Sequence, residues 1–159
     1  MRSTQRSADP PDPSTVPVDR VLLATEGRPI PQSAIRFAAR WHAPVRVVSV
    51  ARVYGISFAL PNPWLMPSRK EWQEQREIVA GAVKELEQQG VKADGHVVGT
   101  RKATRGIVRE AARQACDVIV MAADPPRNRL LADLMWSQEP YRVRRRAPVP
   151  VYLTPRDGD

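Results

Sequence analysis

Cys116 and Ser137 are two candidate nucleophiles of this sequence. Cys116 directly precedes an apolar run, and no neighbouring base is evident that would lower the pKa of its thiol. Ser137 lacks the Gly-x-Ser-x-Gly context of a hydrolase. His42 and His96 stand far apart, with no acidic or cysteine neighbour at ligand spacing. The sequence therefore favours a protein that is not an enzyme and holds no metal ion.

The arginines could instead bind anions. The chain has 25 Lys and Arg residues against 17 Asp and Glu, which gives a net charge of +8. The excess lies in residues 101–116 and 127–146, where a basic surface could attract nucleotides, nucleic acid or acidic proteins. No helix-turn-helix, zinc finger or aromatic stacking strand is visible, so solvated helix faces are favoured over a nucleic-acid footprint.

Alternating strands and helices must position these side chains. Short apolar runs predict strands at residues 21–24, 45–50, 93–98, 117–122 and 149–154. Helical spacing of apolar residues between the strands predicts four helices. Their apolar faces are Ala34, Phe37, Ala38 and Trp41; Ile78, Val79, Ala82, Val83 and Leu86; Ile107, Val108, Ala111, Ala112 and Ala115; and Leu130, Leu131, Leu134 and Met135.

Helix boundaries are marked by particular residues. Ser68 and Glu71 have the spacing of a capping box, and Gly90 is placed to end the helix that follows them. Thr104 is predicted to cap the third helix. Pro140 is predicted to break or kink the fourth.

This alternation predicts a single α/β domain with a doubly wound parallel five-stranded sheet and helices on both faces. Ligands of such sheets bind at the carboxyl ends of the strands, so we expect a ligand site at the loops after the first and fourth strands. We expect a flexible Pro-rich tail at 1–18, the domain at 19–155 and a C-terminal tail at 156–159. The apolar residues within 54–67 could form either an exposed patch for a partner or a lid: Trp64, Leu65 and Met66.

Cellular location follows from what the sequence lacks. A lone cysteine cannot form an intramolecular disulfide, and no run is long and apolar enough to span a membrane. The N-terminus has no apolar stretch of the kind found in a secretory signal. We expect a cytoplasmic protein without a membrane partner.

Four phrases in this order resemble the universal stress protein family over residues 19–155. They are VLLATEG at 21–27, SAIRFA at 33–38, CDVIVM at 116–121 and RRAPVPV at 145–151. The resemblance implies a sheet of order 3-2-1-4-5 with an adenine-nucleotide alpha-hydrolase-like fold. It also implies a homodimer, because family members commonly pair through the last strand, here residues 149–153. Pro150 would limit the hydrogen bonds of that edge.

ATP-binding members of the family carry Gly-x-x-Gly, nine residues, then Gly followed by Ser or Thr. The same spacing here gives Ala123, Pro126, Trp136 and Ser137, so all three glycines are replaced. Glycines let backbone N–H groups approach phosphate oxygens, whereas Pro126 has no such donor and the Trp136 ring fills space. The resemblance implies that Glu26 stands where the family's aspartate meets the nucleoside.

These substitutions predict a non-catalytic regulatory or scaffold domain without a cofactor. One alternative is a sensor of ATP, another adenine nucleotide or a small anion, with Arg127 and Arg129 as phosphate partners. A nucleic-acid binder is a second alternative, and nucleic acid is the less favoured partner. A protein partner is the other candidate. The predicted site residues are Ala24, Thr25, Glu26, Val50, Met121, Ala123, Arg127, Arg129 and Ser137.

Overall fold

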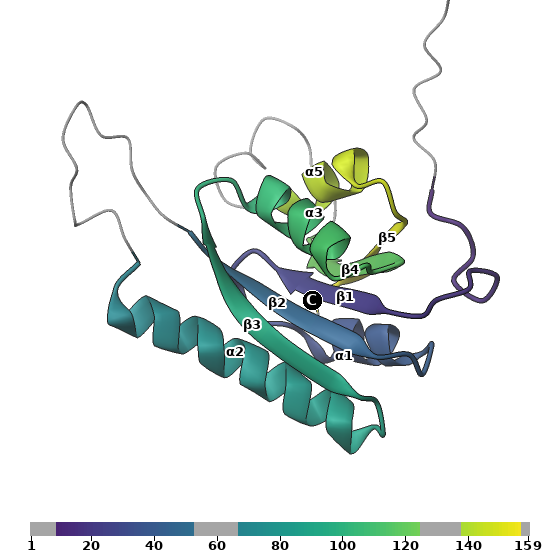
Figure 1. The fold of residues 1–159 in the computed structure, drawn as a ribbon, viewed down its shortest axis with the longest axis horizontal. Helices are drawn as coiled ribbons and strands as arrows, with labels where there is room; N and C mark the ends of the chain where they lie inside the picture. The colour runs from purple at the N-terminus through teal and green to yellow at the C-terminus, as the bar shows by residue number, and fades with distance from the viewer. Residues whose placement is uncertain (1–8, 53–66, 125–137, 157–159) are drawn as a thin grey trace, which may run out of the picture.

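The computed structural model describes residues 9–52, 67–124 and 138–156. A parallel sheet of five strands forms its centre, in the order β3-β2-β1-β4-β5 (Figure 1). The strands are β1 (Val21–Thr25), β2 (Val45–Arg52), β3 (Ala93–Thr100), β4 (Val118–Ala123) and β5 (Val151–Pro155). The predicted α/β class and the strand order that the resemblance implied are both confirmed.

The described residues contain four helices, which cover both faces of the sheet (Figure 1). They are α1 (Gln32–Ala39), α2 (Arg69–Gln88), α3 (Ala103–Arg113) and α5 (Glu139–Arg146). Buried residues of α1 and α2 share one hydrophobic cluster, and those of α3 and α5 share the other. The two clusters are separated by the sheet, as in other doubly wound folds.

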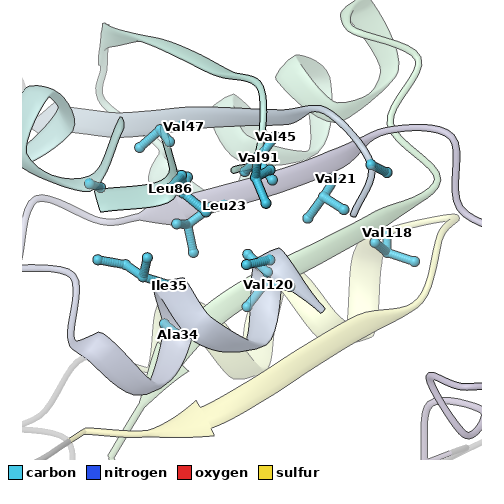
Figure 2. Packing of buried hydrophobic residues seen from close by; sticks show 14 of the residues in the cluster. Val21, Leu23, Ala34, Ile35, Val45, Val47, Leu86, Val91, Val118 and Val120 are labelled. Carbon is cyan, nitrogen blue, oxygen red and sulfur yellow. The ribbon is translucent and has the colours of Figure 1, made fainter. Parts of the chain in front are cut away.

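β1 and β4 lie at the middle of the sheet and are buried along their whole length. Figure 2 shows the α1 and α2 side, where Leu23 and Val120 lie near Ile35 of α1 and Leu86 of α2. Side chains buried on both faces explain the continuous apolar runs of these strands. The centre of the sheet is therefore tightly packed, and the carboxyl ends of β1 and β4 lie at the same edge.

The boundaries of α2 follow the predicted signals. The Ser68 hydroxyl accepts a hydrogen bond from the Glu71 amide, and the Glu71 carboxylate accepts one from the Ser68 amide, which completes a capping box. Gly90 has a φ of +78°, a left-handed conformation that glycine adopts without steric cost. Both predictions for this helix are confirmed.

One prediction about a helix boundary is wrong. Thr104 does not cap α3, because Lys102 holds the cap position and Thr104 is buried inside the helix, where its hydroxyl donates to the Glu139 carboxylate. Pro140 stands in the first turn of α5, where its missing N–H costs no intrahelical bond. Whether it ends a preceding helix stays a prediction, because the residues before Gln138 lie outside the described part of the chain. The predicted helix around residues 130–135 lies outside the described residues, as does the segment 54–66.

Smaller differences concern element ends. β3 continues to Thr100, two residues beyond its predicted end, and β5 begins at Val151 rather than at Val149. Trp41 follows α1 instead of belonging to it, yet its ring still packs with Phe37 and Tyr152 at centroid distances of 5.5 Å. Tertiary packing therefore retains the apolar face that the periodicity predicted.

Residues 9–18 fall within the predicted flexible tail, but they contact the domain. The Tyr152 hydroxyl donates to the Pro11 carbonyl at 2.7 Å, and the Trp41 indole N–H donates to the Pro13 carbonyl at 2.9 Å. Val16 and Val18 pack against the core cluster on the α1 side. These are long-range contacts, which no local spacing in the sequence predicts.

Candidate functional site

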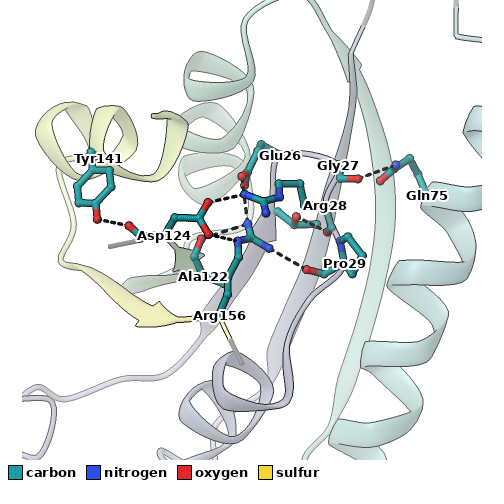
Figure 3. A network of polar contacts seen from close by, with 10 residues as sticks. Glu26, Gly27, Arg28, Pro29, Gln75, Ala122, Asp124, Tyr141 and Arg156 are labelled. Carbon is teal, nitrogen blue, oxygen red and sulfur yellow. Dashed lines mark hydrogen bonds and ion pairs between the residues drawn. The ribbon is translucent and has the colours of Figure 1, made fainter. Parts of the chain in front are cut away.

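The candidate site lies where β1 and β4 end. Both strands are parallel neighbours, so the residues that follow them lie at the same edge of the sheet. Glu26 follows β1 directly, and Asp124 follows β4 directly. Figure 3 shows these two carboxylates facing the side chain of Arg156, which follows β5. Three strand ends thus contribute charged side chains to one place.

The turn after β1 has a fixed conformation. Gly27 has a φ of +102°, and a Cβ at this position would lie 3.0 Å from the Val50 carbonyl oxygen. The Thr25 hydroxyl donates to the Arg28 carbonyl at 2.6 Å, which closes the turn. Gln75 of α2 donates to the Gly27 carbonyl at 3.0 Å and accepts from the Ser49 hydroxyl. A helix and two strands therefore hold Glu26 in position.

Arg156 connects the parts of the site. Its Nη2 lies 3.2 Å from Glu26 Oε1 and 3.5 Å from the Ala122 carbonyl oxygen. Its Nη1 donates to the Pro29 carbonyl at 3.1 Å, and its Nε lies 3.7 Å from Asp124 Oδ1. The guanidinium thus occupies the space between the end of β4 and the turn after β1 (Figure 3).

The second ion pair of the site joins Arg28 to Asp124. Arg28 Nη1 lies 2.5 Å from Asp124 Oδ2, and the Tyr141 hydroxyl of α5 donates to the Asp124 carbonyl at 2.5 Å. Burial raises the pKa of Tyr141, with Arg144 opposing and Asp124 adding to the shift. The phenol therefore stays a hydrogen-bond donor at neutral pH.

Burial of the four charged side chains increases toward Glu26. Side-chain exposure is 37% for Arg28, 16% for Arg156, 12% for Asp124 and 2% for Glu26. Two carboxylates and two guanidinium groups cancel in formal charge. Burial lowers the pKa of Arg156, and Glu26 opposes this shift. An arginine still keeps its charge at neutral pH, so the buried carboxylate retains a cationic partner.

Some polar atoms here lack a hydrogen bond within the described part of the chain: Glu26 Oε2, Arg156 Nε and, on β5, Thr154 Oγ1. A buried polar atom without a partner costs free energy, so Arg156 satisfies Glu26 only in part. Across residues 9–52, 67–124 and 138–156, no group of three metal-ligating side chains comes together. None of the helices described is both long and apolar enough to cross a bilayer.

The structure places the predicted site residues in three environments. Ala24, Val50 and Met121 are at most 2% exposed and belong to the core cluster beneath α3 and α5. Thr25, Glu26 and Ala123 lie at the ends of β1 and β4, as expected. Three further predicted residues lie outside the described residues, so their role in anion binding remains a prediction: Arg127, Arg129 and Ser137. Pro126 and Trp136 lie outside them too.

Sequence reasoning missed Arg28, Gln75, Asp124, Tyr141 and Arg156 as site residues. Asp124 had a usable signal, because it is the first charged residue after a buried parallel strand and such strands end at the ligand edge. Arg156 had none. It lies 130 positions from Glu26 and reaches it only because β5 pairs with β4.

Sheet order and site position place this protein among the α/β domains with an adenine-nucleotide alpha-hydrolase-like fold. The model of the universal stress protein family matches residues 17–155, and the chain belongs to that family. No curated protein shows significant similarity to the chain.

Solved structures of universal stress proteins share the fold at low sequence identity. One from Archaeoglobus fulgidus, in complex with dAMP, is 20% identical with a TM-score of 0.60, covering 84% of this chain and 95% of that one. One from Burkholderia pseudomallei is 20% identical with a TM-score of 0.60, covering 86% and 96%. One from Arabidopsis thaliana with AMP bound is 13% identical with a TM-score of 0.55, covering 88% and 93%.

Proposed function

We propose that this protein is a non-catalytic regulatory or scaffold domain of the universal stress protein family, active as a cytoplasmic homodimer and without ordinary ATP binding. The observation that carries the proposal is the position of the Arg156 guanidinium, 3.2 Å from Glu26 at the ligand edge of the sheet. A nucleoside that met Glu26 would have to displace a buried ion pair. The loss of the family's glycines at Ala123, Pro126 and Trp136 supports the same conclusion.

Ligand titration of the full chain tests this proposal. Thermal unfolding is measured with ATP, ADP, AMP, dAMP and cAMP, each at rising concentration. A ligand present at about 100 times its dissociation constant adds about 2.7 kcal/mol to the stability of the folded state. We expect no shift with any of them. A saturable shift with one would contradict the proposal, and release of phosphate from ATP would contradict the non-catalytic role.

The same titration addresses a second candidate, an adenine-nucleotide or anion sensor. Glu26 Oε2 favours this candidate, because a buried carboxylate oxygen without a partner among the described residues could accept a hydrogen bond from a ligand. The structural relatives with dAMP and AMP make these nucleotides the first probes. A shift that grows in the variant Arg156→Ala would favour the sensor with a displaceable arginine.

The homodimer is proposed to form through the outer edge of β5. Within the described chain β5 ends the strand order and pairs only with β4, so its other edge is open to a second copy. Sedimentation equilibrium over a wide concentration range measures this directly. We expect a dimer whose dissociation is favoured by Leu153→Lys, because Leu153 is a half-buried residue of this edge strand. A monomer at every concentration would contradict it.

Nucleic-acid binding is the remaining candidate, favoured by the way that α3 and α5 pack side by side on one face of the sheet (Figure 1). Their exposed arginines are Arg105, Arg109, Arg113, Arg142, Arg144, Arg145 and Arg146. Gel shifts with single-stranded and duplex nucleic acids at rising salt measure whether the protein binds them and how steeply binding depends on salt. Absence of binding at low salt removes this candidate.

A further inference from the structure

The site at the ends of β1 and β4 has the chemistry of a receptor for a planar cation. Within the described residues, the hydrogen bonds and ion pairs of the Arg156 guanidinium all go to acceptors: the carboxylates of Glu26 and Asp124 and the carbonyls of Ala122 and Pro29. The Arg28 guanidinium is also near enough to lower the pKa of Arg156, but its own carboxylate partner is Asp124. Main-chain carbonyls accept hydrogen bonds and cannot donate them. Acceptors on several sides of one planar group match a guanidinium, which presents five N–H donors in a fixed plane.

The charge of the site requires one cation. Arg28 Nη1 pairs with Asp124 Oδ2 at 2.5 Å, so these two side chains are balanced against each other. Glu26 is then left with Arg156, and its side chain is 2% exposed. A buried carboxylate whose partner is removed carries a large desolvation penalty. An anionic group in place of Arg156 would instead face the unbalanced carboxylate of Glu26, so the site disfavours phosphate.

The backbone holds Arg156 near the site but does not give it ideal geometry. The Ser33 hydroxyl donates to the Pro155 carbonyl at 2.7 Å, which fixes the chain directly before Arg156. Arg156 then reaches Glu26 through one hydrogen bond of 3.2 Å, while Arg156 Nε and Glu26 Oε2 have no hydrogen-bond partner among the described residues. A guanidinium free of this tether could bind the carboxylate through two parallel hydrogen bonds. The free guanidinium would bind with better geometry, whereas Arg156 competes with it through its high effective concentration, because it is part of the same chain.

We propose that the site formed by Glu26, Asp124 and the carbonyls of Ala122 and Pro29 is a guanidinium-binding site, and that Arg156 is its ligand within the chain. The ligand class is a planar cation with several N–H donors, of the kind carried by an arginine side chain. Nucleosides gain access only when Arg156 leaves. This inference rests on the proposed function, since both start from a site that Arg156 closes, but the two fail in different experiments.

Chemical rescue of Arg156→Ala tests the site with three small probes. Methylguanidinium is a planar cation, methylammonium a compact cation, and methylurea a planar molecule without charge. Each is added at about 10 mM, an effective concentration comparable to that of a short tether, with sodium chloride matching the ionic strength. We expect methylguanidinium to raise the Tm of Arg156→Ala by about 2–4 °C, methylammonium by less, and methylurea not at all.

The matched control is Arg142→Ala, which removes a guanidinium that is 53% exposed and pairs with Glu139 at 3.3 Å. Methylguanidinium should leave the Tm of this variant and of the wild-type protein unchanged. Equal shifts in Arg156→Ala and Arg142→Ala would overturn the proposal, as would equal shifts by methylguanidinium and methylurea.

A second measurement covers the case in which Arg156→Ala does not fold. In the wild-type protein the Arg156 Nε–H resonance, assigned by its loss in Arg156→Lys, is followed by NMR. We expect it to exchange with water at least about tenfold more slowly than that of Arg142, because a buried group is shielded from solvent. Equal exchange would overturn the proposal. A nucleotide-induced Tm shift in the wild-type protein would refute the proposed function while leaving the guanidinium result intact.

Discussion

Glu26 and Glu110 are both buried carboxylates, with side chains that are 2% and 3% exposed, but their partners come from different distances along the chain. Glu110 Oε1 accepts from Gln114, the residue that caps the end of α3, at 2.9 Å and lies 3.0 Å from His96 Nε2 on β3. Glu26 depends on Arg156, 130 positions away. Glu110 is therefore bound by residues close to its own helix and on a neighbouring strand, whereas Glu26 is bound by a side chain at the ligand edge of the sheet.

Access to water separates the two regions further. The partners of Glu110 reach the surface, since the side chains of His96 and Arg113 are 38% and 69% exposed. Arg156 is only 16% exposed, and Glu26 Oε2 has no hydrogen bond within the described residues. The Glu110 region therefore fits a structural role, while the Glu26 region retains unused hydrogen-bonding capacity where ligands of this fold bind.

The largest expected effect comes from removing the two carboxylates in turn. Glu26→Ala leaves Arg156 buried without its closest carboxylate, and we expect it to lower the free energy of unfolding by about 3 kcal/mol. Glu110→Ala should cost about 1 kcal/mol, because the side chains of His96 and Gln114 lie near the surface and can hydrogen-bond to water instead. Urea denaturation at neutral pH measures both.

A double-mutant cycle supplies the control for this prediction. Glu26→Ala and Arg156→Ala combined should cost less than the sum of the single changes, with a coupling free energy of about 1–3 kcal/mol. Additive losses, or equal losses for Glu26→Ala and Glu110→Ala, would remove the distinction between the two regions.

A smaller effect concerns Cys116, which is buried near Glu110. Burial raises the pKa of its thiol to about 11, and Arg20 is the largest opposing influence. Below the ordinary value of 9.0 the thiol is protonated in both the folded and the unfolded chain. Between these two values the unfolded thiol ionises first, so stability falls as pH rises, by about 3 kcal/mol in total.

Unfolding of the wild-type protein and of Cys116→Ala between pH 9 and 11 checks this linkage. The slope of the unfolding free energy against pH should be smaller in Cys116→Ala, because this variant lacks the titrating thiol. Tyrosines that titrate in the same range are present in both proteins, so their contribution cancels in the comparison. Identical slopes would show that the thiol does not contribute. A raised pKa also opposes nucleophilic chemistry, in agreement with the sequence-based interpretation of Cys116.

The smallest expected effects come from removing two tyrosine hydroxyls. The Tyr141 hydroxyl donates to the Asp124 carbonyl at 2.5 Å, and the Tyr152 hydroxyl donates to the Pro11 carbonyl at 2.7 Å. Tyr141→Phe and Tyr152→Phe should each cost about 1 kcal/mol. Tyr141→Phe should be non-additive with Arg156→Ala, because Tyr141 positions Asp124. Tyr152→Phe should be additive with Arg156→Ala, because Tyr152 lies on the opposite side of the sheet. If both pairs were additive, Tyr141 would not be coupled to Arg156.

Local signals were enough to predict the framework of this domain. The continuous apolar runs of β1 and β4 mark strands buried on both faces, and the capping box of Ser68 and Glu71 marks the start of α2. Such features depend on residues within a few positions of one another. The error at Thr104 arose because a local capping preference was overruled by packing between α3 and α5, where the Thr104 hydroxyl donates to the Glu139 carboxylate.

Sequence by itself determined the element order, the parallel sheet and the edge at which Glu26 lies, because periodicity and turn residues act over short stretches of chain. Only the tertiary structure decided that Arg156 is the cation that pairs with Glu26. It also decided that residues 9–18 accept hydrogen bonds from Tyr152 and Trp41. Those contacts join segments that strand pairing brings together. An ion pair across 130 residues leaves no spacing in the sequence from which it could be predicted.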